Sequence, residues 1–484
     1  MSLRQKTVTG IFWSSIERFS VQGIQFLLGI IMARILLPAD YGIIAMLAFF
    51  LAISQSFIDS GFSNALIRRQ NRNEIDFSTV FYFNIVVGLV FYFILFFTSP
   101  LIAAFYNTPI LESLTKVVAL NVFINSLTIV QRAKLIINVD FKTQTKASVL
   151  SVIISGIIGI GMAYKGYGVW ALAIQSIVNG VINMISLWIL SGWIPQKSFS
   201  ISSFKEMFFY GFKLLLSGLL NITYQNIYTI VIGKKFSKVE LGNYSYANTF
   251  TNFPSSNISG IIQRVTFPVL CSIQDDEIKL KETFRKFLRL SAFVVFPLMI
   301  GLLAVTEPLI RLLLTDKWSG VIILLQILCL SQMWYPIHAI NLNLLQVKGR
   351  SDLFLRLEII KIVIGISLLI ITIPLGIIAL CWSMVAASLI SLVVNTYYTG
   401  RLIRVGYLRQ MKDLLPTLGN SFSMGIIIWG VTQLIHSKIF ALIIGITVGV
   451  IYYFLVARIT QSKELQDIKS VIDTVKDKLW TTRK

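Results

Sequence analysis

The sequence has few of the side chains from which metal centres are built. It contains two histidines, and its three cysteines lie far apart, in or beside apolar runs. Because no Cys, His or Asp residues cluster at the spacing of metal ligands, a catalytic metal site is not expected. We interpret Cys271, Cys329 and Cys381 as small buried apolar residues in a reducing or lipid environment.

Two further absences argue against an enzyme. No segment follows the Gly-x-x-x-x-Gly-Lys-Ser/Thr pattern of a phosphate-binding loop, so this chain is not expected to use ATP that it binds itself. The longest polar connection, residues 274–289, is basic and too short to form a soluble catalytic domain. We therefore expect no enzymatic activity and no cofactor. Transport would be driven by an ion gradient, by the substrate's own gradient or by a downstream enzyme.

Charged residues are also scarce, which indicates that lipid surrounds much of the chain. Of 484 residues, 13% are charged and 55% are hydrophobic, whereas soluble proteins have about 25% charged residues. Apolar runs of about 20 residues, the length that crosses a bilayer, recur along the whole chain. We predict an all-α integral membrane protein with about fourteen transmembrane helices. They lie near residues 9–36, 41–66, 77–105, 110–133, 144–164, 167–192, 207–233, 240–270, 288–314, 319–345, 353–373, 376–400, 414–435 and 438–459.

Short sequence matches recur at a nearly constant offset between the two halves. The matched positions are Pro100 with Pro308, Val139 with Val347 and Gly168 with Gly376, all 208 residues apart, and Gly42 with Gly242 and Arg34 with Lys234, 200 apart. Such a duplication is typical of transporters in which two related bundles rock about a site between them. We predict a six-helix lobe at 1–200, a second at 201–405, an appended helix pair at 406–460 and a cytoplasmic amphipathic tail at 461–484.

The net charge is +21, and the distribution of the basic residues along the chain agrees with the predicted topology. If the N-terminus is cytoplasmic, roughly thirty of the basic residues fall in cytoplasmic connections, as the positive-inside rule requires. Arg132 is assigned to one of these connections, and the external turn 234–238, which has three lysines, breaks the rule. Nucleic acid is therefore not an expected partner. The first apolar stretch is too long and too polar for a signal peptide and is expected to be the first retained span.

Ionisable residues inside predicted spans are costly and are therefore candidate functional residues. Arg18, Gln22 and Gln25 follow one helical face, as do Lys213, Asn221 and the two tyrosines Tyr224 and Tyr228. Four cations are candidates for binding an anion: Arg18, Lys213, Arg264 and Lys361. Ten other side chains are candidates for lining the cavity or coupling transport to an ion: Glu17, Gln22, Gln25, Asp59, Asn221, Tyr224, Tyr228, Asn248, Asn252 and Glu358.

These candidates favour an anionic substrate taken from the cytoplasmic side. The cations lie toward the cytoplasmic half of their spans and outnumber the acids, and a cleft of one charge sign concentrates ligands of the opposite sign. Arginine offers paired donors to a phosphate. The alternative is structural: Glu17 or Asp59 pairs with Arg18, Glu358 pairs with Lys361, and Lys213 snorkels.

A second polar group lies in the predicted helix 319–345. Trp334, Tyr335 and Asn341 suit contact with a sugar, although an interfacial belt or packing is the favoured interpretation. His338 has the chemistry of a proton carrier, but a single histidine is more often a packing residue.

Two segments have a recognisable pattern, Ala-Arg-Ile-Leu-Leu-Pro-Ala-Asp-Tyr-Gly at 33–42 and Gly-Tyr-Gly-Val-Trp-Ala-Leu at 166–172. Further segments of the same pattern are residues 10–13, 17–18, 59–62, 65–68, 102–106, 140–142 and 193–195. In these segments, and over essentially its full length, the chain resembles the Wzx-type flippases of the polysaccharide transporter family. The resemblance implies two six-helix lobes in a V shape with two extra helices, as in multidrug and toxic-compound extrusion proteins. It also implies flipping of undecaprenyl-pyrophosphate-linked oligosaccharides across the bacterial inner membrane.

The combined hypothesis is a flippase for lipid-linked repeat units of lipopolysaccharide, exopolysaccharide or capsule-type polymers. Arg18 would hold the pyrophosphate, aided by Lys213, Arg264 or Lys361, while both termini stay in the cytoplasm. Partners would be the lipid-linked oligosaccharide, the bilayer and a polysaccharide polymerase or export complex. One alternative is a drug antiporter of the same architecture, which would need an acid-rich cavity. Another is a non-transporting membrane scaffold of a polysaccharide assembly complex.

Overall fold

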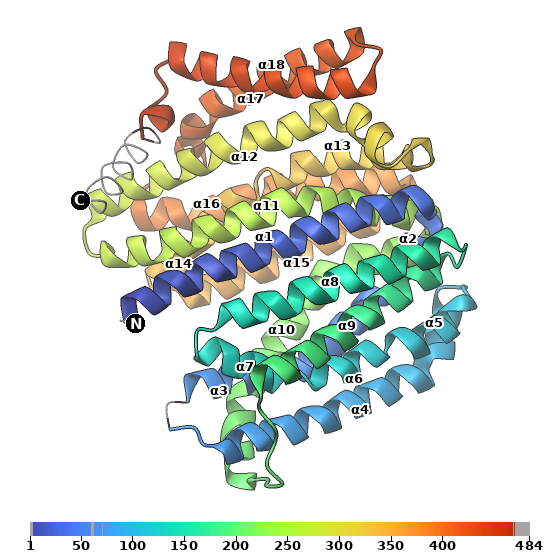
Figure 1. Cartoon of the computed structure of the whole chain (residues 1–484). Coiled ribbons are helices and arrows are strands. Elements are labelled where there is room, and N and C mark those ends of the chain that lie inside the picture. Colours follow the sequence, from blue (N-terminus) through green and yellow to red (C-terminus); the bar gives the residue numbers. More distant parts are fainter. Residues whose placement is uncertain (1–2, 60–61, 70, 468, 470–484) are drawn as a thin grey trace, which may run out of the picture. The chain divides into compact units, whose positions relative to one another are not determined.

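The computed structural model describes residues 3–59, 62–69, 71–467 and 469 (Figure 1). Within those residues the chain forms helices and no strands. Several side chains of the first and tenth helices, those of Arg18 and Lys213 among them, lie outside the described part. The chain divides into two compact units, Met1–Gly242 and Asn243–Lys484.

The first unit contains ten helices in the described residues and the start of an eleventh. They are α1 (Leu3–Ile35), α2 (Pro38–Asp59), α3 (Phe62–Arg68), α4 (Glu74–Phe105), α5 (Ile110–Val118), α6 (Leu120–Ser126), α7 (Ile129–Ile137), α8 (Phe141–Tyr164), α9 (Val169–Ser191), α10 (Ile201–Lys235) and α11 (Lys238–Ser272). Helices α8 and α9 lie side by side along much of their length (Figure 1).

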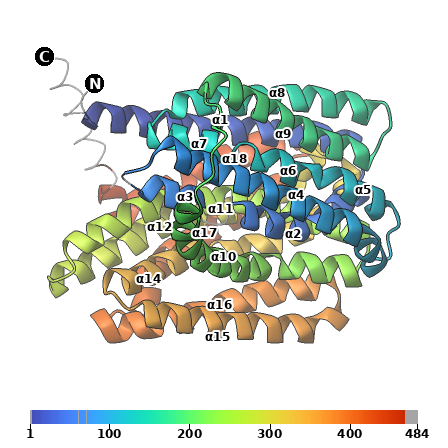
Figure 2. The same cartoon turned by 90° about the horizontal axis from the view of Figure 1, so that it is seen from below.

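The second unit continues from α11 with seven α-helices and two short 3₁₀ turns in the described residues. They are α12 (Glu277–Leu313), η1 (Asp316–Trp318), α13 (Gly320–Gln332), α14 (Tyr335–Val347), α15 (Ser351–Thr372), η2 (Ile373–Leu375), α16 (Ile377–Ile403), α17 (Tyr407–Leu434) and α18 (Lys438–Ile459). Within this unit α15 and α16 pack against each other (Figure 2).

The expectation of an all-α membrane protein is confirmed. Eleven segments of the described chain are long and apolar enough to cross a membrane. The three other predicted spans correspond to α1, α10 and α11, which have 33, 35 and 35 residues. The structure is therefore consistent with fourteen spans. The lobe boundary predicted at residue 200 stays a prediction, and α10 belongs to the first compact unit.

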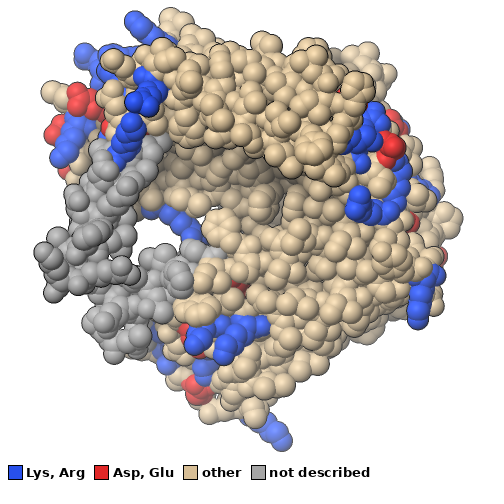
Figure 3. Space-filling view, turned by 45° about the horizontal axis from the view of Figure 1, so that its top comes forward, with Lys and Arg blue, Asp and Glu red and all other residues tan. Residues whose placement is uncertain are grey.

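The distribution of side chains matches a lipid environment. Figure 3 shows charged side chains gathered at the margins of the face drawn, with other residues between them. Large apolar side chains are exposed, with Phe97 at 72% and Ile189 at 73% of their surface. A lipid-facing helix needs no polar outer face, because hydrocarbon solvates apolar side chains.

Helix boundaries follow local capping chemistry. The amide of Asp76 donates to Asn73 and the amide of Asn73 donates to Asp76, both at 2.9 Å, which forms a complete capping box for α4. Asp140 caps α8 by accepting from the amide of Thr143 at 3.1 Å. These bonds satisfy amides that the first helical turn leaves without partners.

The internal repeat is visible in the backbone. Pro100 and Pro308 lie inside the last turns of α4 and α12. Gly168 and Gly376 precede α9 and α16 with φ of +54° and +96°, the left-handed region that favours glycine. Both pairs keep the offset of 208 predicted from the sequence.

One predicted pairing is wrong by two residues. Val139, with φ of +56°, corresponds to Gly349, with φ of +68°, rather than to Val347. Each follows a helix end, and the next residue caps the following helix, at Asp140 and Arg350. The offset is 210 here because the connection that contains η1 is longer than its counterpart between α4 and α5.

The repeat also produces a reciprocal close contact within the first unit. A Cβ atom added to Gly42 would lie 1.9 Å from the carbonyl oxygen of Lys238, and one added to Gly242 would lie 1.8 Å from that of Pro38. Both obstacles are backbone atoms, which cannot turn aside as a flexible side chain can. The first turns of α2 and α11 therefore meet backbone to backbone.

We expect Gly42→Ala to lower the free energy of unfolding by about 1–3 kcal/mol, the usual cost of overpacking. The matched control is Gly161→Ala in α8, where an added Cβ meets nothing within 4 Å. The measurement is the thermal unfolding midpoint of the purified protein by tryptophan fluorescence. Equal midpoints for the two variants would contradict the close contact.

Candidate functional site

Several polar side chains of the first unit, from different helices, are linked to one another. On α2, the Gln55 side-chain amide donates to the Asp59 carboxylate at 3.2 Å. From α6, the Asn125 side-chain amide donates to the Gln55 carbonyl at 3.1 Å. Asp59, which lies at the end of α2, is thus linked through Gln55 to α6 of the same unit.

A second part of the group joins α1 to α8. The Ser148 hydroxyl donates to the Glu17 carboxylate at 3.1 Å. Gln144, one turn earlier on α8, also hydrogen-bonds Glu17. Two helices far apart in the sequence are therefore tied through one carboxylate.

Arg132 of α7 connects the two parts. Its guanidinium interacts electrostatically with both Asp59 and Glu17. We call the seven residues the Arg132 cluster: Glu17, Gln55, Asp59, Asn125, Arg132, Gln144 and Ser148. Its described charged side chains are two carboxylates and one guanidinium. A cluster with this balance can hold an additional proton or cation, or lend its arginine to an anion when the carboxylates are neutralised.

Arg132 is not among the site residues predicted from the sequence. Because other basic residues follow it, it is expected in a cytoplasmic connection. The structure places it inside α7, which runs to Ile137. The available signal was its position within the predicted helix 110–133, where a charge calls for a partner.

The other predicted site residues of the first unit lie on α1 and α10. Arg18 lies on α1 and Lys213 on α10, but both side chains are outside the described residues. Gln25 is exposed, and Gln22 is half-buried on the same helix. On α10, Asn221 is exposed and accepts a bond from Gln225 at 3.2 Å, Tyr224 is half-buried and Tyr228 is buried.

The predicted site residues of the second unit lie on α11 and α15. The Asn252 amide donates to Asn248 at 3.0 Å, and Arg264 is exposed. Lys361 and Glu358 form an ion pair at 2.5 Å, three residues apart on α15. This is the ion pair expected if Glu358 and Lys361 have a structural role and do not bind substrate. A role of these five residues in binding stays a prediction.

Polar residues of α14 form side-chain hydrogen bonds with neighbouring helices. Asn341 and Gln410 exchange two side-chain hydrogen bonds at 2.9 and 3.0 Å. His338 contacts Ser388 at 3.1 Å and Asn395 at 3.2 Å through its two ring nitrogens. These contacts favour the packing interpretation of this helix. In the described residues, no group of three or more His, Cys, Asp or Glu side chains is placed to hold a metal ion.

Arg132→Met should destabilise the protein, because it leaves Glu17 and Asp59 without their shared cation. The expected loss is about 1–3 kcal/mol in the free energy of unfolding, the cost of removing one partner from a buried polar pair. The triple variant Glu17→Gln, Asp59→Asn, Arg132→Met should recover most of it. Lys146→Met, at an exposed position of α8, is the control. A single variant as stable as this control would rule out the cluster.

Curated proteins of similar sequence have names that refer to cell-surface polymers. The lipopolysaccharide biosynthesis protein WzxC of Escherichia coli (strain K12) is 25% identical over 89% of this chain and 90% of its own length. The teichuronic acid biosynthesis protein TuaB of Bacillus subtilis (strain 168) has the same identity and coverage. The succinoglycan biosynthesis transport protein ExoT of Rhizobium meliloti (strain 1021) is 24% identical over 68% of this chain and 67% of its own length.

Solved structures show the same fold. The lipid II flippase MurJ in an inward closed conformation matches with a TM-score of 0.75 and 19% identity, over 93% of this chain and 98% of its own. An inward-facing multidrug resistance MATE family transporter of the MOP superfamily has a TM-score of 0.62 and 16% identity, over 82% and 100%. Residues 31–323, more than half of the sequence, match the family described as polysaccharide biosynthesis protein. This membrane-embedded, internally repeated chain belongs to that polysaccharide biosynthesis family.

Proposed function

We propose that this protein flips polyprenyl-pyrophosphate-linked oligosaccharide repeat units from the cytoplasmic to the outer leaflet of the bacterial inner membrane. The observation that carries the proposal is that the chain belongs to a polysaccharide biosynthesis family and has, in its described residues, eleven helices apolar enough to cross a membrane. A polysaccharide precursor made on a lipid carrier must cross the bilayer, and a multi-spanning protein suits that step. The carrier we infer is undecaprenyl pyrophosphate.

The anionic end of the substrate would be held by cations inside the spans. Arg18 is the proposed anchor of the pyrophosphate, because guanidinium offers paired donors to phosphate oxygens. Lys213, Arg264 and Lys361 would assist it at successive stages. The hydrophilic glycan would occupy the polar side of α1, α10 and α11, while the polyprenyl chain stays in hydrocarbon. The two repeats would expose the site alternately to the two sides.

The Arg132 cluster would couple transport to an ion. Its two carboxylates share one guanidinium, so a proton or sodium ion that neutralises Glu17 or Asp59 changes how strongly Arg132 is held. The freed charge would then favour the substrate-bound state, which is the requirement for coupling two ligands. In this proposal both termini are cytoplasmic, the protein is not an enzyme, and it hands its product to a polymerase or export complex.

A drug antiporter is the second candidate. This candidate is favoured by the charges of the Arg132 cluster, whose described side chains include two carboxylates and one guanidinium. Such an antiporter would be saturated by cationic compounds and would ignore lipid-linked glycans. A transport assay with both substrate classes separates the two functions. A scaffold would move neither.

Arg18→Ala should abolish flipping, and Arg18→Lys should restore part of it, because lysine keeps the charge but loses the paired donors. The assay uses proteoliposomes with the host's lipid-linked repeat unit and scores the glycan accessible to an external label, under proton and sodium gradients. Lys165→Ala, in the exposed connection between α8 and α9, is the control.

Retained flipping by Arg18→Ala would remove that residue from the site without removing the function. No flipping by the wild-type protein under either gradient would overturn the function itself. Movement of a fluorescent cationic drug in the same vesicles would then support the antiporter.

A further inference from the structure

An apolar groove of about 600 Å³ runs between α2, α4 and α10 within the first unit. Aromatic side chains form much of its wall, with Phe49 and Phe50 from α2 and Phe91 and Phe105 from α4. Ile230 of α10 closes it on the third side. The groove extends along α4 to the last residue of that helix, Phe105.

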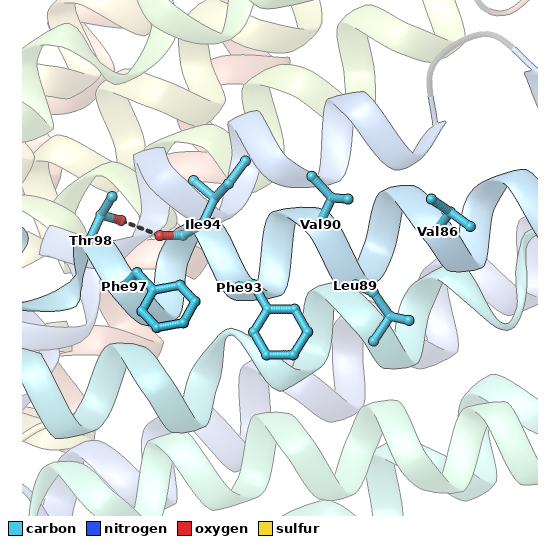
Figure 4. Close-up of a pocket in the computed structure, with 7 residues that line it drawn as sticks. All are labelled: Val86, Leu89, Val90, Phe93, Ile94, Phe97 and Thr98. Atoms are coloured by element: carbon cyan, nitrogen blue, oxygen red, sulfur yellow. Dashed lines mark hydrogen bonds between the residues drawn. The ribbon is translucent and has the colours of Figure 1, made fainter.

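A second hollow of about 590 Å³ adjoins the groove on the outer face of α4 (Figure 4). Ile94 and Thr98 line both, so the two hollows adjoin at these residues. Phe93 and Phe97 stand on one side of this helix and Val90 and Ile94 on the other in Figure 4. Phe97 is 72% exposed, so the mouth of the hollow opens toward the surrounding hydrocarbon.

The two hydroxyl groups that line the groove are not available as donors to an occupant. The Thr98 hydroxyl donates to the Ile94 carbonyl at 2.7 Å, a bond drawn in Figure 4, and the Ser54 hydroxyl donates to the Phe50 carbonyl at 2.9 Å. Each hydroxyl donor is used within its own helix. An occupant therefore gains apolar contact and needs no hydrogen bond, which describes a hydrocarbon chain.

The groove ends at the basic turn 234–238. Lys234 donates to the backbone carbonyl of Phe105, and its ammonium lies 4.9 Å from the centre of the Phe105 ring. Lys235 follows at an exposed position and Lys238 begins α11. The nearby acid, Glu240, accepts bonds from the amide and hydroxyl of Ser237 at 2.9 and 2.8 Å, so its charge caps the helix.

The lysines of this turn have no topological explanation. In the proposed orientation they lie on the outer side, where the positive-inside rule places few cations. Helix-dipole stabilisation accounts for Lys234 and Lys235 in the last turn of α10 but not for Lys238, which starts the next helix. An anionic ligand at the end of the groove accounts for all three.

We infer that this groove is an outer-leaflet site for the isoprenoid lipid carrier, with the chain against α4 and the phosphate at the basic turn. The inference rests on the proposed function for the identity of the lipid. A single long chain suits a groove that follows one helix, and a multiply charged phosphate suits three lysines better than a singly charged phospholipid does. The site would hold the carrier after flipping, before the next reaction consumes the glycan.

The test measures binding of undecaprenyl phosphate and undecaprenol to the purified full-length protein by native mass spectrometry. Ile94→Trp should fill both hollows and weaken both probes about tenfold, since an obstructed apolar contact loses its transfer free energy. Ile157→Trp is the matched control, because Ile157 is 66% exposed on α8, away from the groove.

The lysines are tested with the same two probes. Lys234→Gln with Lys235→Gln should weaken undecaprenyl phosphate about tenfold and leave undecaprenol unchanged, because only the phosphate meets the cations. Lys235→Gln alone keeps the test decisive if the Lys234 substitution disturbs the contact with Phe105. Lys165→Gln, in another connection on the same predicted side, is the control.

Three results would overturn the inference. One is undiminished binding to Ile94→Trp, and another is equal loss of undecaprenol in the lysine variants. The third is displacement of undecaprenyl phosphate by equimolar phosphatidylglycerol, which would make the groove a general phospholipid site. The flipping assay separates the two proposals: groove-dependent binding by a protein that does not flip would overturn only the proposed function.

Discussion

Hydrocarbon offers no hydrogen-bond partners, so polar side chains within a membrane span must be satisfied by other parts of the protein or by water in a cavity. This constraint acts in both units. In the first it places Arg132 within electrostatic range of Glu17 and Asp59, on three different helices. In the second it joins Asn341 to Gln410 by two side-chain hydrogen bonds. Specific polar bonds, added to apolar packing, thus fix which helices are neighbours.

Features that depend on local sequence could be predicted well. The spans follow from the length and apolarity of each run, and the structure has helices in every predicted segment. Short matches also located the repeat, because a proline near a helix end or a glycine with positive φ constrains the backbone wherever it occurs. Pro100 with Pro308 and Gly168 with Gly376 are such positions.

Contacts between distant segments could not be predicted in the same way. Arg132 was identified as basic and was assigned to a loop, because nothing near it in the sequence reveals that α1 and α2 supply its carboxylates. The polar residues of α14 gave the opposite problem. His338 and Asn341 have the chemistry of a ligand site, and only their bonds to Ser388 and Gln410 show that packing uses them. Residue type limits what a side chain can do, and its neighbours decide what it does.

The reciprocal approach of Gly42 and Gly242 is the pattern found at the two-fold axis of a homodimer. The sequence repeat accounts for it, because equivalent residues of the two copies then meet each other reciprocally. In a homodimer every mutation appears twice, whereas in a single chain each repeat varies alone. The Arg132 cluster is an example of such independent variation. Its three charged residues align, at the repeat offsets, with uncharged residues of the second repeat. These counterparts are Ser217, Ser259 and Leu342. The two repeats thus share backbone features, whereas their charged residues differ.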